Sequence, residues 1–412
     1  MIGVGKRPAD HVAASTGRSD AALRATGGSW RGLDLRGLDV ERERPFWVAL
    51  SLVPGVGPVG FARLLAQHGS AEAAWKAGRR LLEGLPRIPD DATPTLDRLQ
   101  RVGAIRLARE VEATTHAAGG LVITALDAAY PSSLASLDPR PAVLYLAGDP
   151  EALAAPCVAL VGTRRASGYG RSVAAELADE LARAGVTVVS GLAIGIDGAA
   201  HAAAVTAGGR SVAVLPSPID RVYPPRHADL ARRLVTSGGA LVSEVAPGQA
   251  IGRPDFARRN RWIAGLSQAV VVVEAPDRSG ALLTAAAAID CGRDLYAVPG
   301  PIDAAGSRGC NRLIADHHAA LLTSPAALLH QIGATGDRRP VSVASLSEAE
   351  GMLLYRLLRR SGSIEELIDR TGLGPGAVAS GLTLLEARGL VESYGGATFH
   401  PTLAARRIER GG

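Results

Sequence analysis

The fold of this chain is decided by the stretch Val158-Ala159-Leu160-Val161-Gly162-Thr163-Arg164-Arg165-Ala166-Ser167. Its first four residues are continuously apolar, which predicts a strand buried on both faces of a parallel sheet. A glycine-containing loop follows, and residues 172–184 then show the spacing of an amphipathic helix. Strand, loop and helix in this order are typical of an α/β fold.

The same alternation runs through residues 120–330. Short apolar runs predict strands at 121–124, 143–146, 158–161, 186–190, 211–215, 240–243, 269–274 and 294–298. Helical patterns separate most of them, for example 228–236 and 282–290. We therefore predict an extended Rossmann-like, doubly wound parallel sheet with helices on both faces.

The flanking regions predict three further parts. Residues 1–44 mix Gly, Ser, Arg and Asp without periodicity, which is typical of a disordered extension. Residues 45–118 show helical patterns around the turn Pro54-Gly55-Val56-Gly57-Pro58, which resembles a helix-hairpin-helix. Such glycines let backbone amides meet a DNA phosphate, and a compact helical adaptor is the alternative. A linker at 331–345 leads to three helices and a hairpin at 346–402, a winged helix.

The composition indicates the cellular compartment of the protein more clearly than its binding partner. The net charge of +5 is mild, but only two of the 45 basic residues, Lys6 and Lys76, are lysines. Arginine binds phosphate through a planar fork, although coding bias is an alternative explanation of its excess. Cys157, Cys291 and Cys310 form no Cys-x-x-Cys pair, no apolar run reaches the length of a membrane span, and the first 19 residues lack a secretory pattern. A cytoplasmic protein without a membrane span, metal site or cofactor is expected.

The loop after 158–161 is the first candidate site. Gly162 lets the backbone approach a ligand, Thr163 follows it in the same loop, and Arg164 offers a fork for phosphate. Ser167 precedes a helix N-terminus that favours an anion. The stretch is neither Gly-x-Gly-x-x-Gly nor a Walker motif. A nucleotide or nucleic-acid phosphate is the expected ligand, and an ordinary tight turn is the alternative.

The segment 253–262 is the second candidate. It carries four arginines against one aspartate, interleaved with Phe256 and Trp262. Positive charge follows a phosphodiester backbone while aromatic rings stack on bases. This pattern predicts contacts to a single strand by Phe256, Arg258, Arg259, Asn260 and Arg261. The alternative is a solvated helix start with the two aromatic side chains in the core, and Trp262 is expected there.

Two further loops lie at the same predicted sheet edge. Ser279 and Gly280 begin a helix and offer another anion-binding N-terminus. In the loop 190–201, Asp197 and His201 lie four residues apart, a spacing that fits either an acid/base pair or a structural hydrogen bond. The structural interpretation is favoured.

Seven motifs in order resemble the family of DNA-processing protein A, also called Smf. They are Gly162-Thr163-Arg164, the loop 190–201, Asp220-Arg221-Val222-Tyr223-Pro224, Arg259-Asn260-Arg261, 279–285, Val298-Pro299-Gly300 and 309–314. The resemblance implies a Rossmann-like protein that binds single-stranded DNA, forms dimers, displaces single-strand-binding protein and loads the RecA recombinase in natural transformation. It implies no catalysis, and it assigns strand binding to Arg164, Phe256, Arg259, Asn260 and Arg261.

The chain departs from the family pattern at one turn, and two other functions are alternatives. Pro216-Ser217-Pro218 stands where the family has a glycine turn, and proline removes backbone donors there. A Rossmann-like nucleotide phosphoribohydrolase is the alternative function, but no acidic residue follows Thr284 in the first turn of that helix. A winged-helix regulator that senses a nucleotide is a third and weaker alternative.

The winged helix itself is predicted not to read duplex DNA. Residues 346–401 carry five arginines against seven acidic residues, and the expected recognition helix 375–388 has only Glu386 and Arg388 as charged residues. A reader of duplex DNA needs phosphate- and base-contacting side chains on that helix. The segment from residue 340 onward should not bind duplex DNA below micromolar concentration at physiological salt. Binding at that level in a gel shift would contradict the expectation, which assigns this module to protein contact or self-association.

Overall fold

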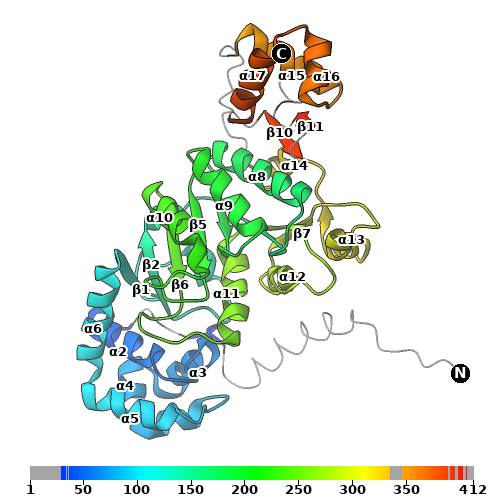
Figure 1. Ribbon diagram of the computed structural model, residues 1–412. Coiled ribbons are helices and arrows are strands. Elements are labelled where there is room, and N and C mark those ends of the chain that lie inside the picture. Colours follow the sequence, from blue (N-terminus) through cyan, green and yellow to red (C-terminus); the bar gives the residue numbers. More distant parts are fainter. Residues whose placement is uncertain are drawn as a thin grey trace, which may run out of the picture. The chain divides into compact units, whose positions relative to one another are not determined.

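The computed structural model describes residues 29–33, 35, 37–334, 346–387, 390–394, 398–401 and 405. The chain forms two compact units, residues 1–336 and 337–412 (Figure 1). The first unit contains a helical domain and a large sheet, and the second is the winged helix. No helix among the described residues is long and apolar enough to cross a membrane.

The helical domain packs around a cluster of aromatic rings. Its elements are α2 (Val40–Ser51), α3 (Pro58–His68), α4 (Ala71–Lys76), η1 (Gly78–Gly84), α5 (Ala92–Val102) and α6 (Ala104–Ala117). Trp30 lies 5.9 Å from both Trp47 and Phe61, measured between ring centroids, and all three are buried. The Trp30 indole Nε1 donates to the Pro58 carbonyl over 3.0 Å.

The expected disordered extension 1–44 is therefore wrong at its C-terminal end. Trp30 belongs to the domain core, and α2 begins at Val40, where the Asp39 side chain accepts a hydrogen bond from the Arg42 amide. A single tryptophan among polar residues shows no periodicity, so the sequence pattern did not reveal its partners. Residues 1–28 lie outside the described part of the chain.

The sheet has the strand order β1-β2-β6-β5-β4-β3-β7-β8-β9. Its strands are β1 (Gly120–Thr124), β2 (Val143–Gly148), β3 (Cys157–Gly162), β4 (Thr187–Ser190), β5 (Ser211–Leu215), β6 (Ala240–Ser243), β7 (Ala269–Glu274), β8 (Asp294–Ala297) and β9 (Ala320–Leu321). The seven strands from β3 to β9 are parallel, which confirms the doubly wound fold. β1 and β2 pair antiparallel, as do β2 and β6, so these first two strands form an antiparallel margin.

Helices cover both faces of this sheet (Figure 1). One face packs against α8 (Gly168–Arg183), α9 (Ile196–Thr206), α10 (Ala228–Thr236) and α14 (Pro325–Gln331). The other packs against α7 (Ser132–Ala135), α11 (Arg253–Leu266), α12 (Gly280–Asp290) and α13 (Arg308–Ala315). The short helices η2 (Pro150–Leu153), η3 (Pro225–His227) and η4 (Ala305–Ser307) lie in connections.

The order of the strands places the topological switch point between β3 and β7. From β3 the chain adds β4, β5 and β6 on one side, whereas β8 and β9 extend the sheet from β7 on the other. Ligands of open α/β sheets bind outside the carboxyl ends of the strands near such a point. A ligand-binding site is therefore expected at the sheet edge formed by the loops that follow β3, β4, β5 and β7.

The winged helix is confirmed as a separate three-helix module with a hairpin. Its elements are α15 (Glu348–Arg359), α16 (Ile364–Thr371), α17 (Pro375–Ala387), β10 (Val391–Tyr394) and β11 (Thr398–Pro401). Ser347 and Ser363 cap the first two helices, each in a reciprocal pair with a glutamate three residues later. Arg388 and most of the expected linker 331–345 lie outside the described residues.

Candidate nucleic-acid interface

Loops from three neighbouring strands surround an open pocket at the carboxyl edge of the sheet. The residues that line it follow β3, β4 and β5 or belong to α11; they are Arg164, Gly191, Ala193, Ile194, Pro216, Tyr223, Pro224, Phe256 and Arg259. We call this site the edge pocket. Pro216, from the proline-containing turn that departs from the family, contributes an apolar part of its wall.

Two aromatic rings and one guanidinium meet at the edge pocket. The ring centroids of Tyr223 and Phe256 lie 5.7 Å apart with an interplanar angle of 84°, an edge-to-face contact. The Arg164 guanidinium carbon lies 6.0 Å from the centroid of the Phe256 ring. Arg164 is exposed, and Tyr223 is 39% exposed. The pocket thus combines apolar planes with a solvent-accessible positive charge.

Tyr223 is a member of this cluster that sequence reasoning did not select. It was noted only as part of the turn 220–224 that carries the family resemblance. The usable signal was an aromatic residue in a loop that follows the carboxyl end of a parallel strand, because such loops share one sheet edge.

Arg259 has a different position from the one expected of a strand-binding residue. Its side chain is buried, with 7% of the residue exposed, and its Nη1 donates to the carbonyl oxygens of Gly191 and Val214 at the ends of β4 and β5. Burial lowers the pKa of Arg259 to about 10, while Asp197 favours its charged form. Arg259 therefore stays charged at neutral pH, and it lines the edge pocket although its side chain is buried.

Asp197 is also buried, and it binds the same loop as Arg259. Its Oδ2 accepts hydrogen bonds from the amides of Gly191 over 3.1 Å and of Ala193 over 3.2 Å. Burial raises the pKa of Asp197, and the positive charge of Arg259 opposes that effect. A Cβ at position 191 would lie 2.9 Å from Asp197 Oδ2 and would overlap the Arg259 guanidinium, so only glycine fits there. The two side chains together fix the loop that lines the pocket.

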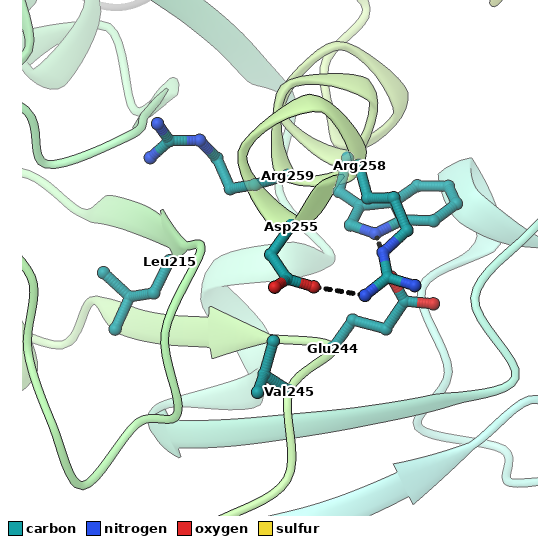
Figure 2. A pocket seen from close by; sticks show the side chains of 7 residues that line it. Leu215, Glu244, Val245, Asp255, Arg258 and Arg259 are labelled. Carbon is teal, nitrogen blue, oxygen red and sulfur yellow. Dashed lines mark hydrogen bonds and ion pairs between the residues drawn. The ribbon is translucent and has the colours of Figure 1, made fainter. Parts of the chain in front are cut away.

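The other polar residues of the α11 cluster are engaged within the protein. Arg258 pairs with Asp255 and lies 3.5 Å from Glu244, whose Oε2 also accepts a 2.9 Å hydrogen bond from the Trp262 indole. Figure 2 shows that Arg258 and Arg259 leave α11 in different directions, with the acidic pair beside Arg258. Trp262 is buried, as expected.

Asn260 and Arg261 also bind neighbours in the protein. Asn260 accepts a hydrogen bond from Arg259 Nε over 3.1 Å, and Arg261 donates to the Asp138 carbonyl over 3.0 Å. Because successive residues of a helix point in different directions, four adjacent residues do not form one strand-binding face. Of this cluster, Phe256 and Arg259 line the edge pocket.

One predicted residue of the loop after β3 lines the edge pocket, and the others contact neighbouring residues of the protein. The Ser167 hydroxyl accepts a 3.0 Å hydrogen bond from the Gly170 amide, and the Thr163 hydroxyl accepts one of 3.2 Å from the Arg165 amide. Gly162 ends β3, where a Cβ would overlap Ile196. Arg164 is the member of this loop that lines the edge pocket.

Ser279 and Gly280 lie at the start of α12, beyond β7 and outside the edge pocket. The Ser279 hydroxyl accepts a 3.3 Å hydrogen bond from the Ala281 amide. Gly280 is exposed. Their role in binding an anion remains a prediction.

The chain is similar to known proteins in both sequence and fold. The family profile described as DNA recombination-mediator protein A matches residues 121–333, which is more than half of the chain. The chain belongs to the DNA recombination-mediator protein A family. Profiles of this family's N-terminal helix-hairpin-helix domain and winged helix match residues 41–113 and 337–397, which confirms both predicted modules.

Several relatives support the assignment to the DNA recombination-mediator protein A family. A putative DNA processing protein from Mycobacterium tuberculosis is 41% identical over 265 residues, covering 62% of this chain and 68% of the relative. A Smf protein from Synechocystis is 30% identical over 406 residues, covering 86% and 98%. The X-ray structure of DNA processing protein A from Streptococcus pneumoniae, at 28% identity, superposes with a TM-score of 0.58 and covers 71% and 99%.

In the loop 190–201, Asp197 and His201 form hydrogen bonds with different partners. Whereas Asp197 binds the loop amides, His201 Nδ1 lies 2.7 Å from the Ser211 hydroxyl, which donates to the Val188 carbonyl over 2.9 Å. The structural interpretation of both residues is confirmed. Among the residues that the structure describes, no three His, Cys, Asp or Glu side chains are grouped to hold a metal ion.

Lowering the pH should destabilise this protein through His201. Burial, with smaller effects from His227 and Arg259, lowers the pKa of His201 to about 3, whereas an unfolded histidine titrates near about 6.5. Between these values the unfolded chain binds a proton that the folded chain excludes, so stability falls as pH falls, by about 1.4 kcal/mol per pH unit.

Urea unfolding of the wild type and of His201→Gln measures this effect. The wild-type advantage in free energy of unfolding should shrink by about 2 kcal/mol between pH 6.5 and pH 5. An advantage that is constant over this range would show that His201 is not held neutral in the folded protein.

Proposed function

We propose that the chain is a single-stranded-DNA-binding mediator of recombination that holds one base of the strand in the edge pocket and its phosphate at Arg164. The observation that carries the proposal is the convergence of Arg164, Tyr223 and Phe256 at this pocket. Membership of the DNA recombination-mediator protein A family supports the same function.

The shape of the site favours a single strand over a duplex. A base can enter between aromatic and apolar walls only when it is unpaired, because a duplex presents its backbone and groove edges instead. Base stacking on an aromatic ring does not depend on the identity of the base. The pocket therefore fits a protein that binds strands of any sequence.

Further exposed arginines extend the positive surface next to the edge pocket. Arg165 follows β3, and Arg221 and Arg226 follow β5, where all three are exposed. Within the described residues none of them forms an ion pair, unlike Arg183 and Arg232, which pair with aspartates. These free charges are suited to the phosphates that flank the bound base, and binding should weaken with salt.

We propose a mediator role without a catalytic step. Asp197 and Glu274, two of the carboxylates near the pocket loops, accept hydrogen bonds from backbone amides, which favours structural roles for both. The bound strand would be passed to the RecA recombinase, with displacement of single-strand-binding protein and dimerisation of the chain, during natural transformation. A pull-down with RecA from the same organism, with and without residues 337–412, tests the partner; no capture by either chain would contradict it.

Phe256→Ala tests the pocket directly. Removal of one stacked ring should weaken oligo-dT binding by about 5- to 150-fold, because stacking on an aromatic side chain contributes about 1–3 kcal/mol per base. Fluorescence anisotropy with labelled oligo-dT measures the affinity.

The winged helix provides a matched control. Tyr355 is 46% exposed and has the Arg359 guanidinium carbon 4.5 Å from its ring centroid, so Tyr355→Ala removes a similar arginine–aromatic contact elsewhere. This variant should bind oligo-dT like the wild type. A folded Phe256→Ala protein with unchanged affinity, or an equal loss in Tyr355→Ala, would reject the edge pocket as the binding site.

A further inference from the structure

The N-terminus of α8 lies at the switch point of the sheet and contains an anion supplied by the chain itself. In dinucleotide-binding folds a phosphate binds at the corresponding helix N-terminus after the first strand. Here Glu274, the last residue of β7, accepts hydrogen bonds at its Oε2 from the Ser167 amide over 2.9 Å and from the Ser167 hydroxyl over 3.0 Å. Only 8% of Glu274 is exposed.

Two glycines shape this position around the carboxylate. A Cβ at Gly170, in the first turn of α8, would overlap Glu274 Oε2. A Cβ at Gly306, in η4, would overlap Glu274 Oε1. The carboxylate therefore fills the space between these two elements.

We infer that Glu274 is a specificity-determining residue that excludes nucleotide phosphates from the switch point. The inference rests on the proposed function, in which Arg164 binds the DNA phosphate on the neighbouring side of the same loop. An incoming phosphate would meet a carboxylate of like charge, which already accepts hydrogen bonds from the Ser167 amide and hydroxyl. This charge disfavours a free anion at a helix N-terminus that would otherwise attract one.

By excluding a phosphate from the α8 terminus, Glu274 helps the protein to distinguish a DNA strand from a free nucleotide. A nucleotide presents the same base and phosphate that the edge pocket and Arg164 would bind. Arg164 and Ser167 belong to the same loop, so a second phosphate seat at α8 would add affinity for a compact nucleotide. With Glu274 in this seat, tight binding requires phosphates that are spaced along a strand.

Glu274→Ala and Glu274→Gln separate the charge from the space it fills. Inorganic phosphate is the probe, in buffers kept at constant ionic strength with chloride. Isothermal titration should find one bound phosphate per chain in Glu274→Ala and none in the wild type. Saturating phosphate should raise the melting temperature of Glu274→Ala by about 5 °C more than that of the wild type. Glu274→Gln fills the space and should bind no phosphate.

Two results would overturn the inference. One is equal phosphate binding by the wild type and Glu274→Ala, and the other is a folded Glu274→Ala chain that binds none. If Glu274→Ala does not fold in chloride, formate or phosphate added during refolding should restore it, and failure of both anions counts against the inference. Oligo-dT binding by Arg164→Ala and Phe256→Ala tests the proposed function separately, so the two can fail independently.

Discussion

Arg164→Ala should weaken binding of oligo-dT by about 10- to 150-fold, because a hydrogen bond between charged groups contributes about 1.5–3 kcal/mol. Arg164 is exposed beside the Phe256 ring, and no carboxylate among the described residues pairs with it. Its guanidinium is therefore available to a phosphate. The slope of the logarithm of affinity against the logarithm of salt concentration should fall by about 0.7 for the lost contact with a single strand.

Arg183→Ala is the matched control for this change. Arg183 lies at the other end of α8 and pairs with Asp179 over 2.7 Å. Its removal also lowers the net charge by one but should leave the affinity and the salt slope nearly unchanged. Similar losses in both variants would mean that Arg164 acts through net charge alone, and the proposed phosphate contact would be wrong.

Arg259→Ala should have the largest effect on stability, about 3–5 kcal/mol in the free energy of unfolding, because it removes the donor to two carbonyl oxygens and the positive charge that favours the buried Asp197 carboxylate. The sequence predicted that Arg259 contacts a single strand. The structure adds a structural role, since Arg259 is buried and its guanidinium donates to carbonyl oxygens at the ends of β4 and β5. Urea unfolding monitored by tryptophan fluorescence measures the loss.

The double variant Arg259→Ala/Asp197→Asn tests the reason for that loss. It should be less destabilised than Arg259→Ala, because no carboxylate is then buried without the positive charge of Arg259, while an amide oxygen can still accept from the loop amides. Arg258→Ala is a neighbouring control, with a side chain that is 41% exposed, and should cost less. A loss below about 1 kcal/mol in Arg259→Ala would contradict a stabilising role of the buried Arg259 guanidinium.

The order of apolar runs and helical patterns was sufficient to predict the fold. Runs such as Val158–Val161 and Ala269–Val273 are buried on both faces, and they became central parallel strands. The direction of β1 and β2 was not predictable in this way, since an apolar run has the same pattern in either orientation. Trp30 was missed because its contacts with Trp47 and Phe61 depend on tertiary packing.

The site was predictable at the level of loops and less so at the level of side chains. The strand order places Arg164 and Phe256 at one edge, as the spacing predicted. Arg258 lies near Glu244, which precedes α11 in the sequence. Arg261 donates to the carbonyl of Asp138, which is 123 residues away in the sequence. Only the folded chain shows that these arginines are engaged. Likewise, Glu274 lies 107 residues from the Ser167 hydroxyl that it binds.

Photo-cross-linking tests the central claim most directly. An oligo-dT strand with one 5-iodouracil per molecule is bound to the full chain, irradiated and mapped by mass spectrometry. We predict cross-links at Tyr223 or Phe256, the two rings of the edge pocket, and their loss in Arg164→Ala at limiting protein concentration. Cross-links confined to the winged helix or to the amino ends of the strands would contradict the edge pocket as the site of single-stranded-DNA binding.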